Sequence, residues 1–176
     1  MTDDYTMLLR RMAGTNGATE FPDESQMGQT VSTNGNVAVS TARAVLGSGS
    51  AYFDGSGDDR LTISNSDENF KFTGDFTVDL WFFAESDTPY QVCPSCDARE
   101  EAIISATPES GELHEYGFFV SAFYSGMRKL RVYWWNCDVH GDNEFAMNQW
   151  HHFAITRSSN SVYLFLNGAI DSDVKQ

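Results

Sequence analysis

Residues 75–84, DFTVDLWFFA, decide the fold class, because their side chains alternate along the chain with a period of two. Neighbouring side chains of an extended strand point to opposite sides, so such a segment buries one face and leaves the other outside. One predicted face carries Phe76, Val78, Leu80 and Phe82, and the other carries Thr77, Asp79, Trp81 and Phe83. The segment therefore predicts a β-strand in the wall of an apolar core.

Similar segments recur along the chain and are separated by turn-forming residues. Strands are predicted most clearly at 116–122, 129–135, 150–157 and 161–166, and less clearly at 5–10, 36–40, 50–53, 60–64 and 101–106. Asn-Gly pairs at 16–17, 34–35 and 167–168 tolerate positive φ and suit tight reversals. Many short strands joined by such turns predict an all-β sandwich, and the lack of a repeat or linker predicts one domain over residues 1–176.

The composition restricts the classes of partner. A formal net charge of −14 repels phosphate backbones and anionic bilayers, which argues against nucleic-acid binding and membrane docking. No apolar run reaches the roughly 18 residues of a membrane span, and residues 1–11 lack the features of a signal peptide. We therefore expect the protein to act in the cell that makes it, or to leave by lysis, through a dedicated machine or within a particle.

Four motifs, in order, resemble those of laminin-G-like, concanavalin A-like domains. They are SAYFDGSGD at 50–58, FTGDFTVDLWFF at 72–83, NQWHHFAITR at 148–157 and VYLFLNGAI at 162–170. With YTMLLRRMAGTNGATEFPDES at 5–25 and NGNVAVSTARAVLGSGSAYFDG at 34–55, nearly the whole chain is similar to versions found in bacteriophage tail fibres and virion surface proteins. The resemblance implies a two-sheet antiparallel jelly roll that binds glycans or proteins, in some members with calcium, and serves adhesion rather than catalysis.

One departure from the family concerns the C-terminal part of the jelly roll. Family members usually continue after the Asn-Gly hairpin with further strands, whereas this sequence ends at Gln176, soon after Asn167-Gly168. Three interpretations stay open: the fold closes differently, the closing strands come from another chain, or the sequence is a fragment. An unclosed sheet edge invites strand addition, so we expect a homo- or hetero-oligomer with other virion or fibre subunits.

The three cysteines and one histidine suggest a metal site. Cys93-Pro-Ser-Cys96 and Cys137-Asp-Val-His140 are two closely spaced ligand pairs, and two such pairs can close a tetrahedral structural zinc site. A disulfide from Cys137 to Cys93 or Cys96 is one alternative, although an odd number of cysteines argues against a pure disulfide framework. Three unrelated thiols are the other alternative.

A glycine-rich acidic loop is a second candidate cation site. Asp54, Asp58 and Asp59 could surround a calcium ion with carboxylate and carbonyl oxygens. The spacing lacks the EF-hand pattern, and a solvated turn explains the same residues.

The tryptophans are candidates for stacking on sugar rings. Trp81, Trp134, Trp135 and Trp150 lie in predicted strands, where most such residues belong to the core. Trp134 and Trp135 are adjacent and must point to opposite faces, so one of them is expected outside the core as a ligand-binding residue.

No catalytic motif accompanies the fold signal, and no catalytic residue is assigned. The paired carboxylates that polysaccharide-cleaving relatives use on one strand are missing, as are nucleophile-elbow and phosphate-loop motifs. The leading hypothesis is a non-catalytic surface, decoration or fibre component of a phage-like virion that binds glycans or a host surface. A free carbohydrate-binding lectin is the alternative, and a glycoside hydrolase is a weaker one.

Overall fold

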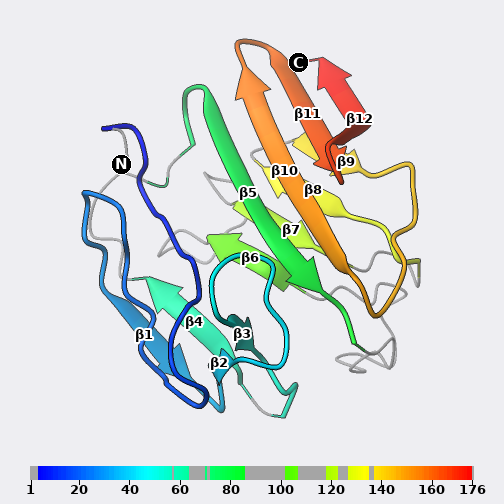
Figure 1. Ribbon diagram of the computed structural model, residues 1–176. Helices are drawn as coiled ribbons and strands as arrows, with labels where there is room; N and C mark the ends of the chain where they lie inside the picture. Colours follow the sequence, from blue (N-terminus) through cyan, green and yellow to red (C-terminus); the bar gives the residue numbers. More distant parts are fainter. Residues whose placement is uncertain are drawn as a thin grey trace. The chain divides into compact units, whose positions relative to one another are not determined.

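Figure 1 shows the computed structural model, which describes residues 4–56, 58–63, 70, 72–85, 102–106, 118–122, 127–134 and 137–175. The chain divides into two compact units, Met1–Asn69 and Phe70–Gln176. The described elements are β-strands that pair antiparallel, which confirms the predicted all-β class. None of the described residues belongs to a helix long and apolar enough to cross a membrane. The single domain stays a prediction.

The second unit contains a four-stranded sheet that we call the β5 sheet, in the order β12-β11-β10-β5. Its strands are β5 (Phe76–Phe83), β10 (Trp150–Ser158), β11 (Ser161–Leu166) and β12 (Ala169–Lys175). Phe153 lies opposite Leu80 on one side and Leu166 on the other, and Ile155 similarly joins Val78 and Leu164. This register keeps the apolar side chains of neighbouring strands on one face, as the period-two pattern predicted.

A second four-stranded sheet, the β7 sheet, has the order β6-β7-β8-β9. Its strands are β6 (Ala102–Ala106), β7 (Phe118–Ser121), β8 (Arg131–Trp134) and β9 (Cys137–His140). In Figure 1 this sheet lies behind the β5 sheet. Phe118, Val120 and Val132 from one sheet and Phe153 and Leu164 from the other are at most 1% exposed and share one core cluster. The two sheets therefore form the predicted sandwich.

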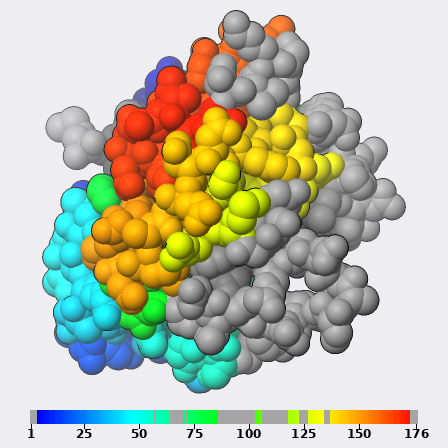
Figure 2. Space-filling view, turned by 90° about the vertical axis from the view of Figure 1, so that its right-hand side faces the viewer, coloured from blue at the N-terminus to red at the C-terminus, as the bar shows by residue number. Residues whose placement is uncertain are grey.

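Asp171 joins the two sheets at one edge. Its carboxylate Oδ1 accepts hydrogen bonds from the backbone N–H and the side-chain Nδ2 of Asn143, at 2.9 and 2.7 Å, and the residue is 3% exposed. A Cβ on Gly141 would overlap Asp171 Oδ2, so the segment after β9 needs glycine there to approach β12. Figure 2 shows β12, in red, against the yellow and orange segment that follows β9.

The first unit has two pairs of strands. β1 (Val31–Asn34) pairs with β4 (Arg60–Ile63), and β2 (Ala38–Ser40) pairs with β3 (Ser50–Tyr52). Its separate small core consists of Phe21, Val37 and Val39, with partly buried apolar side chains packed around them.

The carboxylate of Asp23 organises the N-terminal segment of the first unit. It accepts hydrogen bonds from the backbone N–H groups of Leu9, Ser25 and Gln29, at 3.0, 2.9 and 2.7 Å, and from the Ser25 hydroxyl at 2.6 Å. Burial by itself raises the pKa of Asp23, but these hydrogen bonds outweigh it and lower the pKa to about 2.

Several segments differ from the sequence-based prediction. Residues 5–10 were expected as a strand and form a loop, which the hydrogen bond from Leu9 to Asp23 fixes in place. Conversely, β1, β9 and β12 were not predicted as strands. Residues 137–148, which follow β8, contain the edge strand β9 and the core residue Phe145, which is 2% exposed.

Candidate functional site

The outward side of the β5 sheet is the candidate functional site, and we call it the outer face. Its side chains alternate with the core residues of the same strands, so His152 and Ala154 flank the buried Phe153. Its members are Thr77, Asp79, Trp81 and Phe83 of β5, Trp150, His152, Ala154 and Thr156 of β10, Tyr163 and Phe165 of β11, and Ile170 of β12. The solvent side of an antiparallel sheet is usually polar, so this concentration of rings calls for an explanation.

Trp81 provides the largest exposed ring of the outer face. The residue is 43% exposed, and its indole lies beside the imidazole of His152, its cross-strand partner, with ring centroids 5.0 Å apart. Two residues further along β5, Phe83 makes an edge-to-face contact with its cross-strand partner Trp150, with ring centroids 5.5 Å apart. The imidazole of His152 thus supports the indole from the neighbouring strand, and the indole presents a flat surface to solvent.

A carboxylate and an imidazole lie next to this surface. Oδ2 of Asp79 is 3.5 Å from Nε2 of His152, and the two side chains are 59% and 27% exposed. Asp79 is two residues before Trp81 on the same side of β5. Flat apolar surface and hydrogen-bonding groups therefore converge at this end of the outer face.

The Asn167-Gly168 turn positions His152. The backbone N–H of His152 donates to Asn167 Oδ1 at 3.0 Å, and the backbone N–H of Asn167 donates to His152 O at 2.8 Å. On the core side, Asn167 Nδ2 donates to His151 Nδ1 at 3.0 Å, while His151 Nε2 donates to Ala146 O at 2.7 Å. Both ring nitrogens of His151 thus have hydrogen-bond partners, and the residue is 2% exposed. His151 is thus structural, and His152 belongs to the outer face.

A second aromatic group lies on β11. Tyr163 and Phe165 have ring centroids 6.4 Å apart, and Ile170 opposite Phe165 is 59% exposed. Cross-strand pairing puts Asp79 of β5, Ala154 of β10 and Phe165 of β11 in one row, and Ala154 has the smallest side chain of the three. The outer face therefore carries two aromatic groups, and the small side chain of Ala154 lies in the same row as Phe165.

The structure brings together two of the three aspartates predicted to bind calcium. Asp59 accepts hydrogen bonds from the backbone N–H groups of Asn36 and Asp54, at 2.7 and 3.0 Å. Asp54 accepts from the backbone N–H of Ser56 at 2.7 Å and from Asn36 Nδ2 at 3.3 Å. The hydrogen bonds from Ser56 lower the pKa of Asp54. Both carboxylates are thus engaged in closing the loop.

Asp58, the third of these aspartates, forms an ion pair with Arg60, whose hydrogen bond lowers the pKa of that carboxyl. Within the described ranges, no group of three or more His, Cys, Asp or Glu side chains is arranged to hold a metal ion. Calcium binding by this loop stays a prediction.

The predicted zinc ligands fall partly outside the described residues, because Cys93 and Cys96 lie there. Cys137 points into the core and is 8% exposed, whereas His140 points outward and its Nε2 lies 3.0 Å from Asp138 Oδ1. Asp138 also accepts two hydrogen bonds from Arg131, each 2.8 Å, which lower its pKa. The structure does not bring Cys137 and His140 to one face of β9, and zinc binding stays a prediction.

The predicted ligand-binding tryptophans, Trp134 and Trp135, lie partly or wholly outside the described residues. The backbone of Trp134 ends β8 opposite Cys137, while its side chain and the whole of Trp135 lie outside the described residues. Sequence analysis named all four tryptophans, Trp81 among them, as candidates for stacking on sugar rings, and singled out Trp134 and Trp135 as ligand-binding residues. The sequence did contain a signal that Trp81 is exposed. Trp81 is two residues after Asp79, so it lies on the polar face of the strand and not on the apolar face with Val78 and Leu80.

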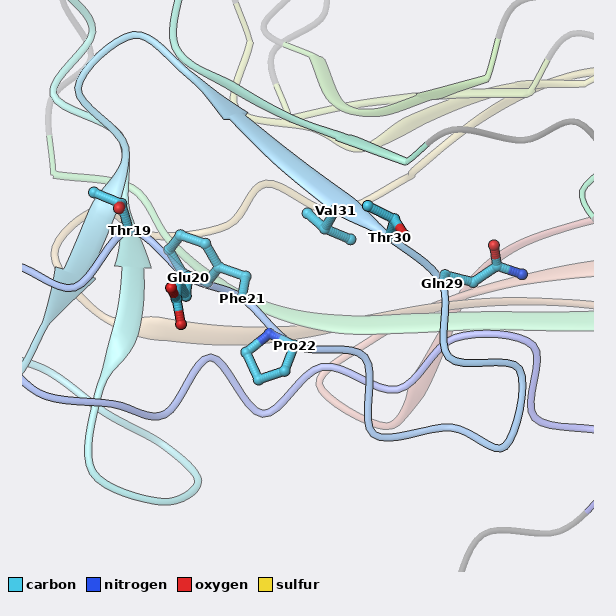
Figure 3. Close-up of a pocket in the computed structure, with 7 residues that line it drawn as sticks. All are labelled: Thr19, Glu20, Phe21, Pro22, Gln29, Thr30 and Val31. Atoms are coloured by element: carbon cyan, nitrogen blue, oxygen red, sulfur yellow. The ribbon is translucent and has the colours of Figure 1, made fainter.

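The first unit has a pocket of its own, drawn in Figure 3. It measures about 290 Å³ and lies between residues 19–22 and residues 29–31, where β1 begins. Its lining residues are Thr19, Glu20, Phe21, Pro22, Gln29, Thr30 and Val31. It presents no paired charges and no exposed ring comparable to Trp81, so we give more weight to the outer face.

Comparison with known proteins gives a family and a fold likeness. The laminin G family model described as "Concanavalin A-like lectin/glucanases superfamily" matches residues 54–175. Comparison with curated proteins gave no match. Among solved structures, residues 221–444 of an S-layer domain-containing protein from Clostridium thermocellum align at 15% identity with a TM-score of 0.41, over 95% of this chain and 71% of that one.

Proposed function

We propose that this chain, which belongs to the concanavalin A-like lectin/glucanase superfamily, is a non-catalytic carbohydrate-binding module that holds a glycan on its outer face. Residues 54–175, which the family model covers, include every strand of the β5 sheet. Because one fold serves many functions, the proposal rests on the site and not on the family alone.

The observation that carries the proposal is the exposed indole of Trp81 beside the Asp79–His152 pair. A sugar ring has an apolar face of C–H groups and a rim of hydroxyls. The indole supplies a flat surface for the apolar face, and the carboxylate 3.5 Å from the imidazole supplies an acceptor for hydroxyl groups.

The carboxylates of the outer face favour binding over cleavage. Glycoside hydrolysis usually needs two carboxyl groups about 5–9.5 Å apart, one on each side of the scissile bond. Among the outward residues of β5, β10 and β11, Asp79 is the one carboxylate, and on β12 the register puts Asp173 opposite the outward Tyr163, three strands away from Asp79. Its nearest titratable neighbour there is His152, which supports recognition of hydroxyls rather than acid catalysis on a glycosidic bond.

We also propose that the module serves adhesion as part of a phage-like particle, together with other subunits of a virion or fibre. The resemblance of residues 5–25 and 34–55 to phage surface proteins supports this context, and the strongly acidic chain suits a crowded, hydrated particle surface. A free lectin is the alternative. Mass spectrometry of purified particles separates the two, because a free lectin is absent from them.

The binding function is tested with Trp81→Ala on an array of immobilised glycans. We expect the wild type to bind at least one glycan and the variant to lose about tenfold or more in affinity, as for a central aromatic contact. Tyr52→Ala is the matched control, because Tyr52 is an aromatic residue of the first unit with a similar exposure of 44%. Failure of the wild type to bind any glycan, or equal binding by Trp81→Ala, contradicts the proposal.

A further inference from the structure

We infer that the site at Trp81 selects glycans whose sugars carry a free, positively charged amine, so that its ligand is a non-acetylated amino sugar. This inference rests on the proposed carbohydrate-binding function and adds the chemical class of the ligand. Three observations carry it: an exposed carboxylate that no cationic side chain of the neighbouring strands neutralises, an exposed indole next to it, and the negative charge of the chain.

Asp79 is the group that favours a cationic ligand. Its side chain is 59% exposed, and the 3.5 Å between its Oδ2 and His152 Nε2 exceeds the roughly 2.7–3.2 Å of an ordinary N–H···O hydrogen bond. Within the described part of the chain, the carboxylate has no other hydrogen bond or ion pair. Asp79 therefore keeps the capacity to accept hydrogen bonds from a ligand.

The surrounding strands supply no basic side chain to this carboxylate. The outward residues of β5, β10 and β11 include no lysine or arginine. Arg157 of β10 is in register with the core residues of its neighbours and donates to the backbone oxygens of Thr73 and Gly74. On β12, the register puts Lys175 opposite Ser161, three strands away from β5. A ligand that brings its own positive charge therefore meets an uncompensated carboxylate.

Trp81 attracts the same cation. It lies two residues after Asp79 on the same side of β5, so their backbones are about 7 Å apart. Its indole is 43% exposed and contacts the imidazole of His152, the ring that Asp79 also approaches. The face of an indole attracts positive charge more strongly than the other aromatic side chains do. A sugar that lies on this indole can direct a charged amine toward Asp79.

A free amine uses these groups better than the other common substituents of sugars. An ammonium donates charge-assisted hydrogen bonds to a carboxylate, and these are stronger than the bonds that a hydroxyl donates. An N-acetyl group is uncharged, so it loses both this bond and the attraction to the indole. Carboxylated or sulfated sugars would bring like charges together on a chain with a formal net charge of −14.

The test measures the affinity of the full chain for soluble probes by isothermal titration calorimetry. The probes are tetrasaccharides of glucosamine and of galactosamine with free amines, the N-acetylated form of each, and tetralysine. All are measured in one mildly acidic buffer with about 0.15 M salt, which screens long-range attraction. We expect one free-amine tetrasaccharide to bind about fivefold or more tightly than its N-acetylated form, as for an exposed ion pair of good geometry. Tetralysine should bind at least tenfold more weakly than that tetrasaccharide.

A pair of variants tests the role of Asp79. Asp79→Asn keeps the size of the side chain and an acceptor oxygen but removes the charge, so the preference for the free amine should fall to about twofold or less. Asp142→Asn is the matched control, because it removes the same charge from an exposed residue of the same unit, and it should keep the preference of the wild type. The comparison of the probes needs no variant, so it decides the question even if Asp79→Asn misfolds.

The outcomes separate this inference from the proposed function. The inference fails, and glycan binding stands, if an N-acetylated or other amine-free glycan binds as tightly as the free-amine forms. Equal binding of tetralysine also overturns the inference, because net charge alone would then explain the affinity. Retention of the full preference by folded Asp79→Asn contradicts the role of the carboxylate. If none of these sugars and no glycan of the array binds, both proposals fail.

Discussion

At the scale of single residues, Asp23 shows how one carboxylate can organise a segment that has few regular hydrogen bonds. Three backbone N–H groups and one hydroxyl converge on it from residues 9–29. The folded-state pKa of about 2 lies below the ordinary value of 3.8. The ionised carboxylate therefore stabilises the fold above about pH 3.8, and this contribution disappears as the pH falls through about 2.

We expect Asp23→Asn to lower the free energy of unfolding near neutral pH, and the difference from the wild type to shrink between about pH 4 and pH 2. The amide keeps the size of the side chain but replaces one acceptor oxygen with a donor that faces N–H groups. Equilibrium unfolding in urea at several pH values, followed by circular dichroism, measures the difference. Glu20→Gln removes a negative charge from the same unit without touching these bonds and serves as the control. A difference that stays constant with pH would contradict the assigned role of Asp23.

At the scale of elements, the hairpin between β11 and β12 couples backbone geometry to the site. Asn167 and Gly168 have φ values of 54° and 80°, as the predicted Asn-Gly turn requires. The Asn167 side chain also bonds the backbone of His152 and the ring of His151. One turn residue thus fixes both the hairpin and a member of the outer face.

Two substitutions separate these roles of Asn167. Asn167→Gly keeps the positive φ but removes both side-chain hydrogen bonds, and should cost about 1–3 kcal/mol. Asn167→Ala removes the same bonds and adds the strain of a left-handed backbone, and should cost about 1 kcal/mol more. Denaturant unfolding compares the two variants with the wild type. Equal stability of all three proteins would show that neither the bonds nor the backbone matters there.

The elements also show which local patterns predict structure. The strands β5, β10 and β11 were predicted almost to their ends, because long runs of alternating bulky side chains coincide with one buried face. β9 and β12 were missed because CDVH and AIDSDVK contain few large apolar residues. Each becomes a strand by pairing with β8 or β11, which is a contact with a partner strand rather than a property of its own residues.

At the scale of the whole molecule, metal content tests the zinc prediction better than stability does. Cys137 is part of the core, so replacing it lowers stability whether or not zinc is present. Elemental analysis of the purified full chain is therefore the informative measurement. About one zinc per chain, lost in His140→Ala, would confirm the site, and less than about 0.2 zinc per chain would exclude it.

The faces of the strands place a condition on that zinc site. Residues three apart on a strand point to opposite sides, and the structure has Cys137 inside and His140 outside. If zinc is found, the two residues cannot ligate it together from β9 as it stands. Retention of zinc in His140→Ala would then assign the ion to other ligands.

The sequence alone determined the all-β class, the faces of the long strands and the position of the Asn-Gly hairpin, because these follow from alternation and from the φ preferences of individual residues. The tertiary structure alone decided which ring is exposed beside polar side chains. Trp81 and Trp150 look alike in the sequence, but exposure depends on what packs beside each ring, and only the register of β5 against β10 places Trp81 next to His152 and Asp79. Cross-strand pairing likewise brings Asp79, Ala154 and Phe165, which are distant in the chain, into one row.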